Sequence, residues 1–450
     1  MKPYPLEAPL GQRYTKGNPT NEDHMADVRP FHGVRYNTDR INDLSLVICP
    51  PYDVISPSDQ EALYKRHPNN VVRLELGQTS PNDSDDDNQY TRAATMFQQW
   101  QQDGALVREG QPAYYLVEET FQWNGKPEAR FSLWSAVRLE PFDQGMVLPH
   151  EHTRPGPKAD RLRLLQAAGA NFSPVMGLYH DRVGDLSAIL KQAAAKAPSA
   201  TGSATDGLSY RTWVIDDPAI TASITNAFAD HLLYLADGHH RYETALHYRD
   251  VDGPQDAEAS RSFAMIALIS MDDPGLKLEP YHRVLANLNP QEEAAIDKAL
   301  AGLPSKGQVN IAGLSAEDAA AKVMAPLRQS EGMTIAVVRG DESLVDLLSL
   351  DDGQAAADFE ALDSCDPWVL QQNVLEPTLG TKLPGLIDYT HDPAEAISQA
   401  RQGVIQRAIL LRPMPLDIFE DVVRRGHRLP PKSTFFWPKL PTGLVINDLT

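Results

Sequence analysis

The sequence predicts a mixed α/β protein with more than one domain, and three observations support this class. Strand-like and helix-like segments alternate along the chain. The 450 residues are enough for two or three domains. Hydrophobic residues make up 42% and charged residues 23%, as in ordinary globular proteins. We therefore expect an N-terminal segment over 1–110, a central α/β core over 111–290 and a C-terminal α/β region over 291–450.

The bulk composition narrows the classes of partner. The formal net charge is −20 with a pI near 5.0, which disfavours nucleic acid, because sequence-independent DNA binding needs a broad basic face. Two cysteines, Cys49 and Cys365, are too few for a disulfide framework and fit a reducing compartment. The start, MKPYPLEAPLGQRY, lacks an apolar signal core, and no apolar run is long enough to span a membrane. We expect a cytoplasmic protein with no membrane partner, and the oligomeric state stays open.

The N-terminal region is expected to begin with extended segments at 28–37 and 44–56. A helix should follow, with Ser56 as its N-cap, Pro57 in its first turn and the acidic Asp59 near its positive end. The motif PPYDV then lies in a stiff loop just before that helix, and it presents Tyr52 and Asp53. These two side chains either join a functional site or serve only the turn.

Further elements have clear local signals. Ala93, Phe97 and Trp100 share one face of a predicted helix that ends before Gly104. Residues 113–140 read as a β-hairpin, because Asn124-Gly125 is a strong signal for a tight turn. A further helix should start at 289–290, where Asn caps and Pro occupies the first turn.

The stretch ADGHHRYETA marks a strand-to-helix corner after the apolar run LLYL. Gly238 can adopt a positive φ or let a ligand approach the backbone, and the following helix start favours an anion. Arg241 has a forked donor that suits phosphate oxygens, while His239 and His240 can donate hydrogen bonds, act as acid or base, or bind metal. Asp237 can hold magnesium, orient a histidine or accept a proton. The corner either grips a phosphorylated ligand or is a well-capped turn.

Two other polar clusters could join this site. The loop HEHTRPGPKADR suits a second anion or a substrate phosphate, although a solvated surface loop is the alternative, and its His-x-His spacing is a weak metal signal. The motif PYHRVL follows an apolar strand and a turn, and its two cations either line the same cleft or lie on the surface. The expected members are His150, Glu151, His152, Arg154, Lys158, Arg161, His282 and Arg283.

Several familiar motifs are absent, namely GxGxxG, GxxxxGK[ST], GxSxG and HExxH. The segment PPKSTFFWPK places Lys432, Ser433 and Thr434 beside aromatic residues, but no glycine-rich cradle precedes the lysine. The segment is therefore not a phosphate loop of this type; it either lies over an active site or docks the tail of the chain, and we expect docking.

The stretch from Asp237 to Tyr242 resembles the glycine-histidine-arginine box of the ParB/sulfiredoxin superfamily, whose members bind nucleotide phosphates at such a corner. His239 stands where sulfiredoxin has its catalytic cysteine, which excludes sulfiredoxin chemistry. Nearly the whole chain, from about 29 to 440, also resembles the uncharacterised prokaryotic family called domain of unknown function 1015. The shared landmarks are RPFHGVRYN, PPYDVIS, HEHTRPGPKADRL, ADGHHRYETA, PYHRVL and PPKSTFFWPK.

The superfamily resemblance implies a ParB/sulfiredoxin-like nucleotide-binding core with additional α/β segments. In the free serine kinases of that superfamily an acid from the N-terminal part acts as the base on the serine hydroxyl, which makes Asp53 the candidate base here. The implied cofactors are Mg²⁺ and ATP or ADP, and the implied partner is a small phosphorylated ligand.

We assign the candidate residues to four roles. They are catalytic (Asp53, Asp237, His239, His240), phosphate-binding (Gly238, His240, Arg241, Arg154, Lys158, Arg161, His282, Arg283), substrate-binding (Tyr52, Glu151) and metal-binding (Asp237 for magnesium, His150, His152).

Three functions fit the sequence. The first is phosphoryl transfer on a small metabolite, as a nucleotide-dependent kinase of free serine or as a phosphoserine phosphatase. The second is a metal-dependent hydrolase that uses the histidines of these clusters. The third is a nucleotide-switched binding protein without small-molecule chemistry.

Overall fold

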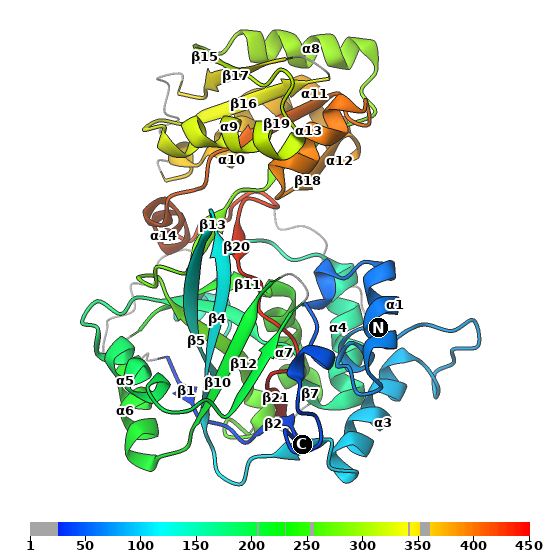
Figure 1. Ribbon diagram of the computed structural model, residues 1–450, viewed down its shortest axis with the longest axis vertical. Coiled ribbons are helices and arrows are strands. Elements are labelled where there is room, and N and C mark those ends of the chain that lie inside the picture. Colours follow the sequence, from blue (N-terminus) through cyan, green and yellow to red (C-terminus); the bar gives the residue numbers. More distant parts are fainter. Residues whose placement is uncertain (1–25, 205–206, 230, 253–255, 341–342, 352–360) are drawn as a thin grey trace. The chain divides into compact units, whose positions relative to one another are not determined.

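The chain forms a mixed α/β structure in two units, as a computed structural model shows (Figure 1). The structure describes residues 26–204, 207–229, 231–252, 256–340, 343–351 and 361–450. The first unit comprises 1–277 and 438–450, and the second comprises 278–437. The expected divisions near 110 and 290 do not coincide with these bounds, because the last residues of the chain return to the first unit. The chain passes between the units at β13 (Lys277–Glu279) and after β20 (Phe435–Trp437), which form a two-stranded ribbon.

The first unit contains two sheets. Its strands are β1 (Val28–Arg29), β2 (Gly33–Tyr36), β3 (Leu106–Arg108), β4 (Tyr114–Trp123), β5 (Lys126–Arg138), β6 (Val147–Leu148), β7 (Ala170–Asn171), β8 (Val175–Tyr179), β9 (Ala200–Ser203), β10 (Ser209–Ile215), β11 (Leu233–Asp237), β12 (Phe263–Ser270) and β21 (Ile446–Asp448). The large sheet has the order β6-β11-β8-β12-β5-β4-β10-β9, with β1 beside β5, and the small sheet has the order β3-β2-β21-β7.

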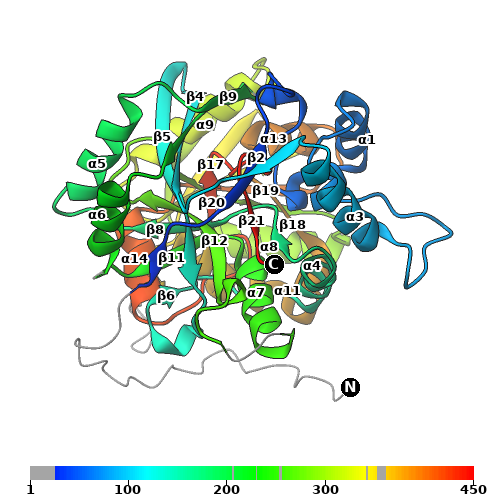
Figure 2. The same cartoon turned by 90° about the horizontal axis from the view of Figure 1, so that it is seen from below.

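Helices flank the sheets of the first unit. They are α1 (Pro57–Arg66), α2 (Val72–Glu75), α3 (Gln89–Gln102), α4 (Pro155–Ala168), α5 (Asp185–Ala194), α6 (Pro218–Phe228) and α7 (His239–Asp252), with short 3₁₀ turns η1 (Leu44–Leu46), η2 (Tyr52–Val54), η3 (Phe142–Gln144) and η4 (Ser260–Ser262). Helices α5 and α6 lie together at one edge, and α1, α3 and α4 lie at the other (Figures 1 and 2). Apolar side chains of the large sheet pack with α5, α6 and α7 in one core.

The local sequence signals of this unit are confirmed. Ser56 and Asp59 form a reciprocal capping box at the start of α1. The hairpin of β4 and β5 turns at Asn124 and Gly125, whose φ angles of 50° and 74° are both positive, as a type I′ turn requires. The expectation of an extended 44–56 segment is wrong in part, because Asp43 caps the turn η1 by accepting the Ser45 N–H.

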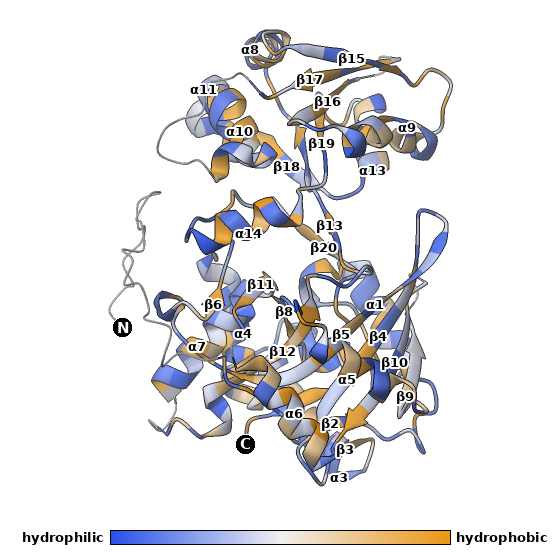
Figure 3. Ribbon diagram, turned by 90° about the vertical axis from the view of Figure 1, so that its left-hand side faces the viewer, coloured by the Kyte–Doolittle hydropathy of each residue, from blue (hydrophilic) through white to orange (hydrophobic). Residues whose placement is uncertain are grey.

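The second unit is a sheet covered on both faces. Its strands have the order β15-β17-β16-β19-β14-β18. Along β16, Ala336 and Val338 pack with α9 and α13, while Ile335 and Val337 pack with α8 and the α10–α11 region, as the two-residue period of a strand requires. In α14, hydrophobic and hydrophilic residues take different sides of the helix (Figure 3).

The elements of the second unit have the following bounds. The strands are β14 (His282–Leu285), β15 (Ser305–Asn310), β16 (Thr334–Arg339), β17 (Leu344–Ser349), β18 (Ile387–Thr390) and β19 (Arg407–Leu411). The helices are α8 (Pro290–Ala301), α9 (Ala316–Gln329), α10 (Asp366–Leu370), α11 (Glu376–Leu379), α12 (Leu383–Leu386), α13 (Pro393–Arg401) and α14 (Leu416–Arg424), with short turns η5 (Leu362–Ser364), η6 (Gln371–Leu375) and η7 (Gly380–Lys382).

Candidate functional site

The corner between β11 and α7 has the geometry that its sequence predicts. Gly238 has a φ of +88°, a region that strongly favours glycine. Its N–H donates to Asp237 Oδ1 at 2.8 Å, and its carbonyl accepts the first helical hydrogen bond, from Tyr242 N at 3.0 Å. The turn therefore places Asp237 and the first turn of α7 on the same short loop.

Arg241 folds back over this glycine. A Cβ atom built on Gly238 would lie 3.0 Å from both Nε and Nη2 of Arg241, so a side chain at this position would press on the guanidinium. Nη1 donates to the carbonyl of Pro174 and holds the group in place. Among the described residues, no hydrogen-bond acceptor or ion-pair partner meets Nε or Nη2. Two donors of a fixed fork are thus available to an anion at the corner.

Asp237 forms an ion pair with a residue from the far end of the sequence. Its Oδ2 accepts from Lys439 Nζ at 2.9 Å, although 202 residues separate the two. Burial alone would raise the pKa of Asp237, but the charges of Lys439 and Arg241 and the hydrogen bonds from Lys439 and Gly238 hold it well below its usual range. Asp237 is therefore ionised at neutral pH.

His240 is held by the polar loop between β6 and α4. Its Nε2 accepts the backbone N–H of Arg154 at 2.9 Å. Burial, together with the charges of Lys158 and Arg154, lowers the pKa of His240 against the opposing charges of Glu243 and Asp53. His240 is thus a neutral imidazole beside the corner. The side chain of Arg154 is exposed, and the described residues offer it no hydrogen-bond partner.

His239 turns toward the interior. It is 5% exposed, its Nε2 accepts the backbone N–H of His150 at 3.3 Å, and the two rings meet edge to face with centroids 4.5 Å apart. The His150 Nδ1 lies 2.7 Å from the carbonyl of Leu235 in β11. These contacts join the loop to the strand, and the catalytic assignment of His239 stays a prediction.

The rest of the polar loop packs along α7. Lys158 Nζ and Thr153 Oγ1 both donate to Glu243 Oε2, at 2.8 and 2.6 Å. Glu151 is half-buried and His152 is exposed in the same loop. The structure thus brings this loop to the corner, while the roles of Glu151 and His152 stay predictions.

The PPYDV loop also reaches the corner. Tyr52 and Asp53 lie in η2, and the ring of Tyr52 is covered by the guanidinium of Arg161 at 4.1 Å from its centroid. Burial raises the pKa of Tyr52 to about 12, against the lowering charge of Arg241. Asp53 is exposed, and its charge acts on both Tyr52 and His240. Arg161 and Arg241 line one cavity, so Tyr52 lies close to the corner, while the role of Asp53 as the base stays a prediction.

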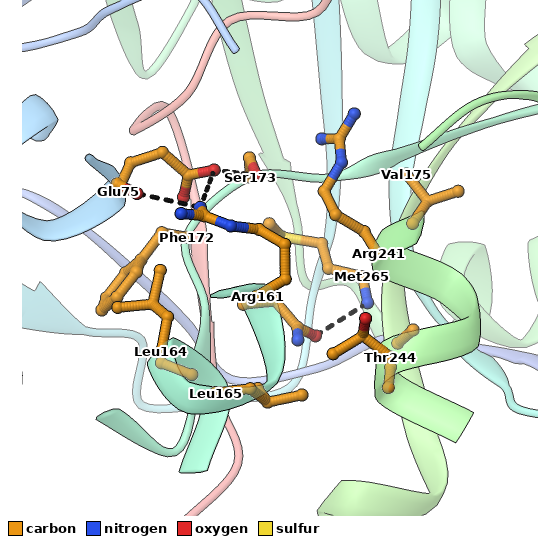
Figure 4. A pocket seen from close by; sticks show the side chains of 14 residues that line it. Glu75, Arg161, Leu164, Leu165, Phe172, Ser173, Val175, Arg241, Thr244 and Met265 are labelled. Carbon is orange, nitrogen blue, oxygen red and sulfur yellow. Dashed lines mark hydrogen bonds and ion pairs between the residues drawn. The ribbon is translucent and has the colours of Figure 1, made fainter. Parts of the chain in front are cut away.

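A small cavity of about 50 Å³ lies next to Arg241 (Figure 4). On one side Arg161 donates to the Glu75 carbonyl at 2.9 Å and to Glu75 Oε1 at 3.3 Å, and Ser173 donates to the same oxygen at 2.8 Å. Arg161 also pairs with Asp160, so carboxylates of the chain already engage its guanidinium. Its assignment as a phosphate ligand stays a prediction.

His282 and Arg283 belong to the second unit, in β14, and both are 1% exposed. His282 Nδ1 accepts the backbone N–H of Leu411 at 3.1 Å, and burial together with the charge of Arg283 lowers the pKa of His282 to about 3. Arg283 donates to the carbonyls of Tyr281 and Lys432, and burial lowers its pKa to about 10. Their membership of a phosphate site stays a prediction.

Sequence reasoning missed three residues of this region. They are Lys439, Glu243 and Glu75, each of which pairs with a candidate residue. Lys439 ends the segment PPKSTFFWPK. Its place directly after Trp437 and Pro438 is the local feature that could have marked it as a candidate. The pairings themselves connect distant parts of the chain, which no local pattern records.

Magnesium fits the corner only together with a ligand. Within the described ranges there is no group of three or more His, Cys, Asp or Glu side chains that could hold a metal ion. Magnesium commonly keeps several waters and binds one or two carboxylates plus substrate phosphates, so Asp237 could serve nucleotide-borne magnesium. In the part of the chain that the structure describes, no helix combines the length and apolarity needed to traverse a bilayer.

The fold and the site define a mixed α/β protein with a strand–glycine–helix corner. The chain belongs to the family described as protein of unknown function (DUF1015), whose model matches residues 28–365. The comparison with curated proteins finds no match.

Several solved structures are similar to parts of the chain. A conserved hypothetical protein from Pyrococcus furiosus is 14% identical, over 69% of this chain and 93% of that one, with a TM-score of 0.33. A free serine kinase in complex with AMP is 13% identical, over 70% and 92%, with a TM-score of 0.33. A C-terminally truncated SbnI from Staphylococcus aureus is 10% identical, over 67% and 82%, also with a TM-score of 0.33.

Proposed function

We propose that the protein is a phosphoryl-transfer enzyme that uses a nucleotide to phosphorylate a hydroxyl group of a small metabolite. The observation that carries this proposal is the guanidinium of Arg241, which lies over Gly238 at a helix start with two donor nitrogens that no described residue engages. A backbone that can be approached closely, a helix N-terminus and a forked cation are the groups that recognise phosphate.

The terminal phosphate of the nucleotide would lie against Gly238 and Arg241. The neutral ring of His240 accepts the Arg154 N–H through Nε2, which leaves Nδ1 to donate to a phosphate oxygen. The exposed side chain of Arg154 supplies a further cation at the same loop. Magnesium, when bound with the nucleotide, neutralises phosphate charge, and Asp237 is the carboxylate that would hold it.

Asp53 is the base in this scheme. It is exposed on a loop whose neighbour Tyr52 is fixed under Arg161, and its charge already acts on His240. The acceptor oxygen attacks the terminal phosphorus, the bond from that phosphorus to the bridging oxygen breaks, and Asp53 takes the hydroxyl proton. ATP would leave as ADP, or ADP as AMP. L-serine is the first acceptor to test, by the superfamily resemblance of the corner.

Phosphorus NMR tests the proposal directly. The protein is incubated with magnesium, ATP or ADP, and L-serine, and separately with phosphoserine alone. We expect a new phosphomonoester signal that requires both nucleotide and acceptor. Asp53→Asn should abolish it, whereas Asp39→Asn, at another exposed aspartate, should leave it unchanged.

Other outcomes would replace the proposal. Phosphate released from phosphoserine without nucleotide would identify a phosphatase. A tightly held transition metal found in the purified protein would favour the metal-dependent hydrolase. Slow nucleotide turnover that no acceptor stimulates would favour the nucleotide-switched binding protein.

A further inference from the structure

We propose that Lys439 is a phosphate-binding cation of the corner, which Asp237 holds in place until an anion arrives. This inference rests on the proposed function, because it concerns the same site, and it adds a residue from the C-terminal segment 438–450. The observation behind it is the 2.9 Å ion pair between Lys439 Nζ and Asp237 Oδ2.

The backbone that carries Lys439 is firmly anchored in the first unit. Leu440 is buried, and Thr442 exchanges two backbone hydrogen bonds with Cys49, at 2.8 and 3.2 Å. The next residues form β21, which pairs with β2 and β7. Because Cys49 directly precedes the PPYDV motif, one short segment holds that loop and also delivers a lysine to the α7 corner.

The charges at the corner favour the binding of an anion. Two cations, Lys439 and Arg241, both act on the carboxylate of Asp237. The two side chains of the ion pair are only 14% and 21% exposed, so neither charge is fully solvated. A phosphate at Gly238 would meet both cations.

The two cations differ in their freedom to move. Arg241 is tied by Nη1 to the Pro174 carbonyl and rests on Gly238. Lys439 is a compact charge on a flexible stem, which can turn from a carboxylate to a phosphate with little cost in geometry. Asp237 keeps the Gly238 N–H when the lysine leaves, and its carboxylate then becomes available to magnesium that arrives with the nucleotide.

This arrangement predicts opposite effects for the two partners of one ion pair. Removing the lysine charge removes a phosphate contact, so Lys439→Gln should weaken binding. Removing the aspartate charge breaks the ion pair that competes with the phosphate, so Asp237→Asn should strengthen binding when metal is absent. A pair that only stabilises the fold would not give effects of opposite sign.

Isothermal titration calorimetry on the full chain, with EDTA present, tests the inference with ADP and with inorganic pyrophosphate as probes. Relative to the unmodified chain, we expect Lys439→Gln to weaken ADP binding about tenfold and Asp237→Asn to tighten it about tenfold, by the usual strength of a charge-assisted hydrogen bond. Lys439→Arg, which keeps the charge, should stay close to the unmodified protein. The matched control is Lys277→Gln, whose lysine pairs with Glu128 at 2.8 Å with similar exposure, and which should change nothing.

The possible results distinguish a failure of the Lys439 assignment from a failure of the proposed function. Lys439 has no phosphate role if ADP binds and neither Lys439→Gln nor Asp237→Asn changes its affinity. If ADP fails to bind but pyrophosphate binds and depends on Lys439, the lysine assignment stands and the nucleotide function is lost. Failure of both probes to bind the unmodified protein overturns both proposals. If Lys439→Gln folds poorly, Asp237→Asn decides the inference alone, because ADP affinity that does not rise in this variant overturns it.

Discussion

The ring of His240 accepts the backbone N–H of Arg154 at 2.9 Å, across 86 residues of sequence. This hydrogen bond joins the two polar motifs of the first unit, and it requires that His240 Nε2 carry no proton. The residue before Pro155 thereby sets which nitrogen of the imidazole can donate to a ligand.

The first prediction concerns the pKa of that ring. Because burial and nearby cations lower it, His240 should titrate below the ordinary value of 6.5, and Lys158→Met should raise its pKa by removing one of those cations. NMR of histidine-labelled protein measures both values, with His240→Gln used to assign the resonance. A His240 pKa at or above 6.5 would refute this description of the site.

The second prediction concerns Gly238. Gly238→Ala places a side chain at a φ of +88° and also pushes against Arg241, whereas Gly184→Ala meets a similar φ of +81° with open space around it. Both should lose stability, by about 1–3 kcal/mol for the backbone strain. Only Gly238→Ala should also weaken binding of magnesium ADP, because it displaces the guanidinium. Thermal unfolding and calorimetry measure the two effects, and equal binding by both variants would contradict the role given to the glycine.

The third prediction concerns the buried pair of Glu75 and Arg161. Glu75→Met leaves Asp160 as the carboxylate that pairs with the guanidinium and should cost about 3 kcal/mol of unfolding free energy. The double variant Glu75→Met with Arg161→Met should cost less than the sum of the single variants, because it removes both charges of the buried pair. Urea unfolding measures the costs, and Glu61→Met, which removes an exposed partner of Lys65, serves as the control. Additive costs would show that the two charges are not coupled.

The fourth prediction concerns acid sensitivity in the second unit. The pKa of His282 is about 3 in the folded chain, below its ordinary value of 6.5, so the unfolded state binds the proton more readily between these values. Stability should therefore be full above pH 6.5 and fall as the pH decreases, by about 1.4 kcal/mol per pH unit from this one group. Between pH 6.5 and 5.0 the loss should reach about 2 kcal/mol.

Hydrogen exchange of the β14 and β19 amides, corrected for intrinsic rates, measures this loss in the full chain. His282→Gln should show a smaller loss of protection between pH 6.5 and 5.0, since it has no proton to gain. An identical loss in both proteins would assign the acid sensitivity to other groups.

Some features of the fold can be predicted from the sequence because they depend only on neighbouring residues. The capping box at Ser56, the turn at Asn124-Gly125 and the positive φ of Gly238 depend on neighbouring residues, and each was predictable. The expected approach of the PPYDV loop to the α7 corner follows from the proposed mechanism rather than from any sequence pattern. Neither strand periodicity nor composition could show which distant side chains would pair.

The segment 438–450 is the clearest example of a feature that the sequence does not predict. A division into consecutive regions assigned 291–450 to one C-terminal part, but residues 438–450 add β21 to the first unit and bring Lys439 to Asp237. A division by sequence order alone predicts domains that are each continuous in sequence. The pairing of β21 with β2 and β7 breaks this rule, and no local sequence pattern indicates it. The site that the sequence predicts therefore lacks Lys439.

Binding of magnesium ADP to the unmodified protein and to Arg241→Gln, measured by isothermal titration calorimetry, tests the central claim most directly. The claim is that the corner at Gly238 holds a phosphate through Arg241. We expect binding to the unmodified protein and a loss of about 10- to 100-fold in Arg241→Gln, the usual range for a charge-assisted hydrogen bond. Arg163→Gln, at an exposed arginine on α4, should bind as the unmodified protein does. Equal affinity in Arg241→Gln, or no binding by the unmodified chain, would contradict the account.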